Sequence, residues 1–203
     1  TTGDNMDEPD ETFTVTLTAP TYATVTDGLG VGTIPDVDPE PDVNWTVSSQ
    51  NVNEGGGTFG PRRIKLTLNN GTRPTNLVDF PILVKLNSSR IDYNLTQNSG
   101  QDIRFVDADG VTVLPHQIEM WNEAGNSFVW VKVPQINASS NTDFIWMYYG
   151  SQAMPDSQQP TAVWNQNFIG VWHLNDGSDS SAHKNDGALL GTVTIAGNNG
   201  MAR

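Results

Sequence analysis

Hydrophobic and polar residues alternate with a period of two in most apolar segments of this chain, and several segments are rich in aromatic and β-branched residues. In a β-strand successive side chains point to opposite faces, so this alternation predicts strands with one buried face. The segments that carry the pattern are Phe13–Leu17, Ile64–Leu68, Ile82–Leu86, Phe128–Val133, Phe144–Tyr149 and Phe168–Leu174.

Turn-forming dipeptides separate these segments, and no stretch of ten or more residues has helical spacing. The dipeptides are Asp27-Gly28, Asn70-Gly71, Asp109-Gly110, Gly125-Asn126, Gly177-Ser178 and Asp186-Gly187. Short strands between such turns are typical of sandwiches and jelly rolls. We therefore predict an all-β chain of immunoglobulin-like or jelly-roll β-sandwich modules in tandem, with the first and the last module incomplete.

Composition changes this picture in three ways. The 203 residues are 36 % hydrophobic and include six Trp, so the chain can bury a core. The formal net charge of −13 argues against a nucleic-acid partner, which needs a basic surface, and is compatible with divalent cations or with solubility alone. There is no Cys, which excludes thiol catalysis, and no apolar run approaches the length of a transmembrane segment.

An acidic pattern covers residues 4–38, DNMDEPDETFTVTLTAPTYATVTDGLGVGTIPDVD. It resembles the C-terminal part of a Calx-β domain, in which an acidic loop, the strand ETFTVTL and a final GVGTI strand lead to terminal Asp residues. That resemblance implies an immunoglobulin-like sandwich with Ca²⁺ at one end, and clustered carboxylates are the usual ligands of this hard cation. The candidate ligands are Asp4, Glu8, Glu11, Asp36 and Asp38.

Two observations bear on this calcium hypothesis. Val37 stands in the middle of the usual terminal Asp triplet and removes one ligand. Residues 43–57, VNWTVSSQNVNEGGG, are similar to the first strand of a Calx-β domain, and Glu54 occupies the place of a ligating Glu in that family. The alternative is that all of these side chains are solvated loop acids without a bound ion.

The central block, residues 60–150, resembles a family of surface proteins catalogued as domain-of-unknown-function family 2341. The matching stretches are LVDFPILVKL (77–86), DIRFVDADGVTVLPHQIEMW (102–121), FVWVKVP (128–134) and FIWMYYG (144–150). Downstream, AVWNQNFIGVWHLN (162–175) and DSSAHKNDG (179–187) resemble the opening of a concanavalin A-like or laminin G-type lectin sandwich. The expected organisation is thus 1–38, a linker and strand at 39–59, 60–150, a linker at 151–161, and 162–203.

Catalytic chemistry finds little support in the residues. Asp107 and Asp109 are expected to shape a turn between strands, and Glu119 has no second carboxylate at a spacing typical of acid/base pairs. His173 and His183 lack a third ligand for zinc. We therefore expect a protein that is not an enzyme and has no catalytic residues.

Aromatic residues on the central strands leave two interpretations open. They form either a sugar-stacking platform or, as is more common, core and cross-strand pairs. The residues concerned are Trp121, Trp130, Trp146, Tyr148 and Tyr149.

Three functional hypotheses follow from these patterns and resemblances. The first is a secreted or cell-surface calcium-binding protein that acts in adhesion or in glycan and matrix binding. The second is a structural subunit of an extracellular fibre or sheath, in which copies of the chain exchange β-strands. The third and weakest is an accessory module of a polysaccharide-degrading enzyme. Ca²⁺, glycans and other copies of the chain are the expected partners.

The hairpin at residues 12–34 has too few strands to bury its apolar side chains, so we expect a strand outside it, 43–57 among the candidates, to cover it.

Overall fold

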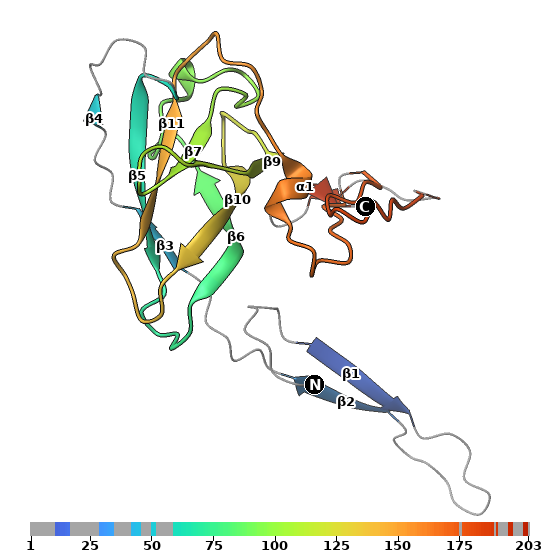
Figure 1. Cartoon of the computed structure of the whole chain (residues 1–203). Helices are drawn as coiled ribbons and strands as arrows, with labels where there is room; N and C mark the ends of the chain where they lie inside the picture. Colours follow the sequence, from blue (N-terminus) through green and yellow to red (C-terminus); the bar gives the residue numbers. More distant parts are fainter. Residues whose placement is uncertain are drawn as a thin grey trace, which may run out of the picture. The chain divides into compact units, whose positions relative to one another are not determined.

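The computed structural model describes residues 11–16, 29–34, 42–45, 50–51, 59–174, 176–188, 190, 195–196 and 201–202. For Glu11, Ile34 and the residues at 42–45, 50–51, 195–196 and 201–202, the backbone alone is described. The chain forms two compact units, Thr1–Pro41 and Asp42–Arg203. Each unit is described by itself below, and the elements are labelled in Figure 1.

The first unit contains an antiparallel hairpin of β1 (Glu11–Thr16) and β2 (Leu29–Ile34). The register pairs Phe13 with Gly32, and the Phe13 ring occupies the space that a Cβ at Gly32 would need. Phe13 is nevertheless 51 % exposed and Val31 65 % exposed. Among the described residues, β1 and β2 pair only with each other.

Of the covering strands expected for the hairpin, the one within this chain, 43–57, is wrong for the described residues, and a strand from another copy stays a prediction. The candidate segment 43–57 contributes β3 (Asp42–Trp45) and β4 (Gln50–Asn51), and both of these strands pair with β5 (Arg62–Asn69) in the second unit. The physical reason is that β5 is a longer pairing partner for these two strands than the hairpin strands are. β5 offers eight residues of edge, and its alternating burial already ties it to a core.

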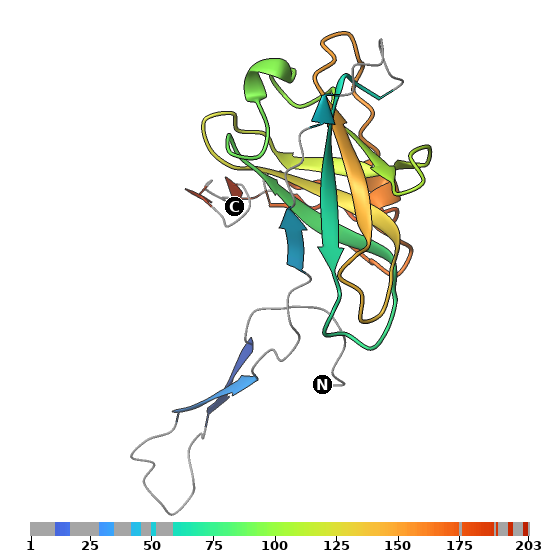
Figure 2. The same cartoon turned by 90° about the vertical axis from the view of Figure 1, so that its left-hand side faces the viewer.

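The second unit is a sandwich of two antiparallel sheets. The larger sheet has the order β3-β5-β11-β7-β8, with β4 also on β5, and the smaller has the order β6-β10-β9. The two sheets lie face to face in Figures 1 and 2. The remaining strands of the sandwich are β6 (Leu77–Leu86), β7 (Arg104–Asp107), β8 (Val113–Leu114), β9 (His116–Met120), β10 (Ser127–Ile136) and β11 (Phe144–Tyr149).

Helical structure is minor. Within the described part of the chain it amounts to the 3₁₀ turn η1 (Tyr93–Leu95) and the single-turn helix α1 (Pro160–Val163). A short hairpin of β12 (Ile195–Ala196) and β13 (Met201–Ala202) follows near the C-terminus. The all-β prediction is confirmed, and no helix in the described ranges has the length and apolar character to cross a membrane.

The core lies between the two sheets, as the period-two pattern predicts. On β5 the side chains of Ile64, Leu66 and Leu68 are buried, while the intervening side chains are partly exposed. The facing residues on β6 and β10 follow the same alternation. The buried residues of those two strands include Ile82, Val84, Leu86, Val129, Val131 and Val133.

Two aspartates organise the loops of this unit. Asp109 accepts hydrogen bonds from the backbone N–H groups of Val111 and Thr112 at 2.9 Å each, which confirms the predicted turn between β7 and β8. The Thr112 hydroxyl bond, followed by these backbone bonds, lowers the pKa of Asp109. Asp102 is fully buried and accepts N–H bonds from Gln97 and Gly150, so it ties loops distant in sequence together.

One predicted strand is wrong. Residues 168–174 form no strand, and their only ladder contact is an isolated bridge between Trp172 and Asp179. The reason is local. The backbone N–H of Val171 donates to the side chain of Asp179 at 2.8 Å. This N–H group is therefore bonded to a carboxylate and not to a backbone carbonyl of a neighbouring strand.

Candidate functional site

The outer face of the β6-β10-β9 sheet is covered by the chain that follows β11. Helix α1 packs against β9 and β10. The residues after it, 164–174 and 176–187, are called the docked segment below. Their first side chain, Trp164, is 6 % exposed and packs edge-on against Trp130 with ring centroids 5.1 Å apart. Phe168 packs against Trp164 in turn, at 5.3 Å.

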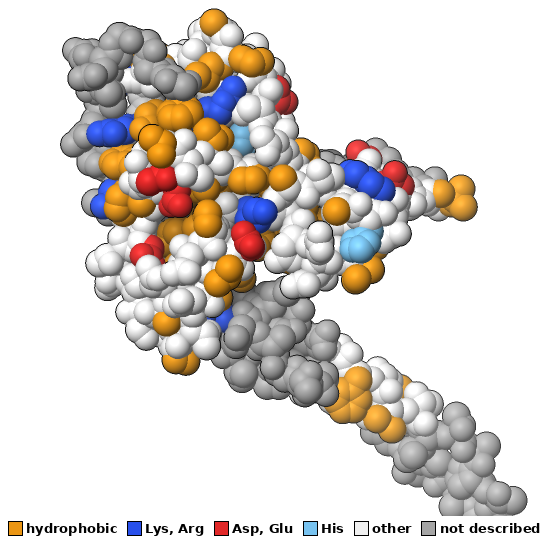
Figure 3. Space-filling view, in the orientation of Figure 1, with side chains coloured by type: hydrophobic (Ala, Val, Ile, Leu, Met, Phe, Trp, Pro, Cys, Tyr) orange, Lys and Arg blue, Asp and Glu red, His pale blue; other side chains and the backbone are white. Residues whose placement is uncertain are grey.

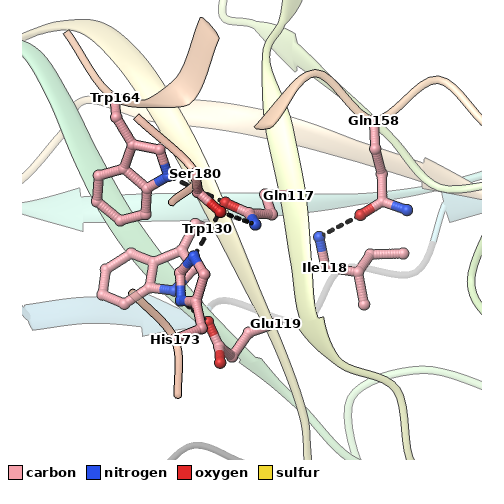
Figure 4. Close-up of polar contacts among 8 residues, drawn as sticks. All are labelled: Gln117, Ile118, Glu119, Trp130, Gln158, Trp164, His173 and Ser180. Atoms are coloured by element: carbon pink, nitrogen blue, oxygen red, sulfur yellow. Dashed lines mark hydrogen bonds and ion pairs between the residues drawn. The ribbon is translucent and has the colours of Figure 1, made fainter. Parts of the chain in front are cut away.

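A network of polar contacts surrounds this aromatic pair (Figure 4). Gln117 on β9 accepts a hydrogen bond from Trp164 Nε1 at 3.0 Å and donates one to Ser180 Oγ at 2.8 Å. Farther along β9, the backbone N–H of Ile118 donates to the side chain of Gln158 at 2.6 Å. Strand β9 thus contacts Gln158, Trp164 and Ser180, each of which is forty or more residues away from its partner on the strand.

Glu119 is the charged centre of this network. Its Oε2 atom accepts a hydrogen bond from Trp130 Nε1 at 3.1 Å and forms an ion pair with His173 Nδ1. The other ring nitrogen of His173 lies 3.2 Å from Gln117 Oε1. The side chains of Glu119 and His173 are only 6 % and 11 % exposed. Low exposure strengthens such contacts, because water screens them little.

The end of the docked segment is a loop built around Asp179. Although burial alone raises the pKa of this carboxyl, N–H bonds from Val171, Ser181 and Asn185 lower it, and its pKa lies well below the ordinary range. The loop closes where the backbone N–H of Asp179 donates to Asp186 Oδ1 at 2.8 Å. The arrangement is therefore an ionised carboxylate that acts as a structural acceptor.

The outer face of the larger sheet is built differently. Three aromatic side chains of β11 (Phe144, Trp146 and Tyr148) lie beside Arg63 and Lys65 of β5, and these five residues are called the aromatic–cationic strip below. All five are partly exposed. This face is turned toward the viewer in Figure 2, and in Figure 3 hydrophobic and Lys/Arg side chains adjoin on the left, where β5 and β11 lie.

Cation–π contacts connect the strip across the two strands. The Arg63 guanidinium lies 4.3 Å from the centroid of the Trp146 ring, and the Lys65 ammonium lies 4.0 Å from that of Phe144. Phe144 and Trp146 also pack edge-on at 5.5 Å. The strip thus combines apolar ring surface with positive charge in a chain whose net charge is −13.

The two interpretations of the aromatic residues are divided by this geometry. Tyr149 is buried in the core, and Trp121 packs on the core with its ring 5.4 Å from that of Tyr93, as the core interpretation predicts. Trp130 lies beneath the docked segment. Trp146 and Tyr148 lie on the outer face and are not core residues, but they are paired across to Lys65 and Arg63 of β5, as the cross-strand part of that interpretation predicts.

The predicted calcium ligands are largely beyond what the structure describes. Asp4, Glu8, Asp36, Asp38 and Glu54 lie outside the described residues, and Glu11 is described by its backbone alone. The hairpin register pairs Glu11 with Ile34, at the end of β2 that precedes Asp36 and Asp38 in sequence. Among the residues that the structure describes, no group of three or more His, Asp or Glu side chains could hold a metal ion.

The sequence analysis missed the residues that hold the docked segment in place: Gln117, Trp164, Ser180 and Asp179. A signal existed only for Asp179, since an Asp two residues before a Ser is a common turn motif. Gln117 contacts Ser180 and His173 across more than fifty residues. No short-range pattern reports such contacts.

The family comparison covers strands β7 to β11, helix α1 and most of the docked segment. The model of a family described as Domain of unknown function (DUF2341) matches residues 99–186. The match begins inside the expected block 60–150 and continues through the docked segment to Asp186, which closes the Asp179 loop. No curated protein and no solved structure matched the chain. The matched region and the structure both join the docked segment to the central sandwich, whereas the resemblance of residues 162–203 to a lectin domain stays a prediction.

Proposed function

We propose that this chain is a non-catalytic part of an extracellular surface protein and that the aromatic–cationic strip binds acidic glycans. The observation that carries the proposal is the pairing of ring surface with cations on one partly exposed face, Lys65 over Phe144 and Arg63 over Trp146. Aromatic rings offer an apolar surface to the C–H groups of a pyranose. Cations complement the carboxylate or sulfate groups of an acidic polysaccharide.

The charge of the chain makes this ligand class more specific. With 23 Asp and Glu against 10 Lys and Arg, most of the chain repels a polyanion. Arg63 and Lys65 point to the same face of β5 and concentrate two cations in one place. A neutral glycan would gain nothing from this concentration, because it carries no anionic group for the cations to complement.

Isothermal titration calorimetry with the 203-residue chain tests the proposal. An alginate or polygalacturonate oligosaccharide should bind, and a cello-oligosaccharide of equal length should bind at least tenfold more weakly. Trp146→Ala and Lys65→Ala should each weaken acidic-glycan binding by about tenfold or more, as expected for the loss of a stacked ring or a charge-assisted contact. Raising the salt concentration should weaken binding further.

Lys85→Ala is the matched control. Lys85 lies on β6 of the other sheet with its ammonium 5.8 Å from the Phe128 ring, so it is a second lysine in an aromatic contact. Its loss should leave glycan affinity unchanged. Equal losses for Lys65→Ala and Lys85→Ala, or no binding of any acidic glycan, would mean that the strip serves only to stabilise the sheet.

Calcium binding is a separate part of the proposal and rests on the acidic pattern of residues 4–38. Millimolar Ca²⁺ should raise the melting temperature, because an ion that binds only the folded state stabilises it by mass action. Glu8→Gln with Glu11→Gln should abolish that rise, and Mg²⁺ should not reproduce it. An unchanged melting temperature in wild type would identify these residues as solvated acids.

A second candidate function is the fibre subunit, and the hairpin is the observation that favours it. Phe13, Val15, Leu29 and Val31 are each more than half exposed, and an isolated two-stranded hairpin is marginally stable in water. A strand from another copy would bury them. Analytical ultracentrifugation should then show association that Phe13→Ser with Val31→Ser abolishes; a monomer at all concentrations would exclude this function.

A further inference from the structure

Both ring nitrogens of His173 face oxygen atoms. Nδ1 pairs with Glu119 Oε2, and Nε2 lies 3.2 Å from Gln117 Oε1. A neutral imidazole carries one N–H donor and one acceptor nitrogen, so it can satisfy only one of these oxygens. The doubly protonated imidazolium donates to both.

The two acceptor atoms of Gln117 and Glu119 that face His173 also accept hydrogen bonds from indole N–H groups, which can only donate. Trp164 Nε1 lies 3.0 Å from Gln117 Oε1, so this atom must be the amide oxygen and not the nitrogen. The amide nitrogen is in turn placed to donate to Ser180 Oγ. In the same way Trp130 Nε1 donates to Glu119 Oε2, the carboxylate atom that pairs with His173. A flipped Gln117 amide would point its N–H₂ at the Trp164 N–H.

We propose that His173 is a proton-dependent latch that holds the docked segment on the sheet. In its imidazolium form it bridges Glu119 and Gln117 and thereby joins the segment to β9. When the imidazolium loses its proton, one of these two contacts becomes a repulsion between acceptors, and the segment opens more often. Opening exposes Trp130 and Trp164, which pack on each other in the closed form.

The ionisable groups around the latch come from each neighbouring element. β9 supplies Glu119, which forms the only ion pair of the imidazole among the described residues. Asp179 is occupied by its N–H donors and is not a second partner. The other ionisable residues on the surrounding elements are His116 on β9, Lys132 on β10, Asp156 before α1, and Asp176, His183, Lys184 and Asp186 on the segment.

Hydrogen exchange of the full chain measures the latch directly. The indole N–H of Trp164 donates to Gln117 on β9, and that of Trp130 donates to Glu119 beneath the segment, so both N–H groups are protected while the segment is closed. After correction for intrinsic exchange, their opening should increase by about tenfold to a hundredfold between pH 5 and pH 8, the size expected for one charge-assisted hydrogen bond. Amides of β10 should show no such rise.

Three variants separate the latch from a general effect of pH. His173→Gln should remove the pH dependence, whereas His183→Gln, which changes an exposed histidine of the same segment, should retain it. Glu119→Gln should weaken the pH dependence, because one of the two oxygens that the imidazolium bridges is then no longer part of a carboxylate.

The ring itself provides a measurement that needs no variant. Nitrogen-15 chemical shifts of His173 in the wild-type chain should be those of an imidazolium at pH 5, where the two indole N–H groups are best protected. A neutral ring at that pH would overturn the proposal. A pH response that persists in His173→Gln, or a wild-type segment whose opening does not change with pH, would also overturn it.

Discussion

The two outer faces of the sandwich start from the same pattern and end in different environments. On β10 the outward residue Trp130 lies under the docked segment, and on β11 the outward residue Trp146 lies under Arg63. Each Trp stands between core residues in an alternating strand, so nothing in the strand itself distinguishes them. The difference teaches that an outward aromatic residue takes its role from what the rest of the chain brings to it.

The contacts that cover each face also differ in kind. The docked segment contributes a buried Trp that packs on Trp130 of β10 and a set of polar contacts to β9. The strip is covered by cations from the adjacent strand of the same sheet. We therefore expect mutations on the first face to act on stability and mutations on the second to act on binding.

The largest expected effect comes from Trp164→Ala. Trp164 is buried and its ring touches Trp130, Phe168 and His173, so truncation should cost about 3–5 kcal/mol of unfolding free energy. Trp146→Ala should cost clearly less, since its ring is partly exposed. Urea denaturation of both variants checks the comparison. Equal losses would show that the two faces are energetically alike.

The next effect acts on the core that both faces share. His116 is 1 % exposed, and burial, with a further contribution from the nearby Arg104 charge, lowers its pKa from 6.5 to about 4. The folded state therefore prefers neutral His116, whose stabilisation is complete above pH 6.5 and is lost as the pH falls toward 4. The loss should reach about 3 kcal/mol for a shift of this size.

Urea denaturation between pH 7 and pH 4 measures this loss, and His116→Gln should flatten the profile in that window. Because His116 packs against Phe105 at 5.4 Å within the core, hydrogen exchange should increase on both sheets together. Exchange that increases on one sheet alone would contradict a shared core. If the variant does not fold, the titration of the His116 ring in wild type by nuclear magnetic resonance still tests the lowered pKa.

The smallest effect concerns the cation–π pairs on the strip. Lys65→Ala should cost about 0.5–1 kcal/mol of unfolding free energy, the usual size for a partly exposed pair. Lys85→Ala should cost less, because its ammonium lies farther from the Phe128 ring, at 5.8 Å against 4.0 Å. A double-mutant cycle of Lys65→Ala with Phe144→Leu isolates the pair; a coupling near zero would mean that the two side chains are merely neighbours.

Local patterns in the sequence predicted the strands of the sandwich well. The alternation in Ile64–Leu68, Ile82–Leu86 and Phe144–Tyr149 reappears as β5, β6 and β11. The turn at Asp109-Gly110 was predictable because its hydrogen bonds span only two or three residues. The strand predicted at 168–174 was wrong. Its apolar alternation resembles that of the true strands, but its backbone bonds to the side chain of Asp179 and not to a neighbouring strand.

What the sequence by itself determined is the class of the protein: an all-β chain whose strands alternate between core and surface, and whose residues 99–186 match a known family. Only the tertiary structure decided which outward aromatic residues are covered, that Gln117 joins Trp164 to Ser180, and that β3 belongs to β5. The physical reason is the separation in sequence between the residues that make each contact. Side-chain alternation is a property of neighbouring residues, whereas each of these contacts joins residues separated by twenty or more positions and exists only once the two sheets and the docked segment have come together.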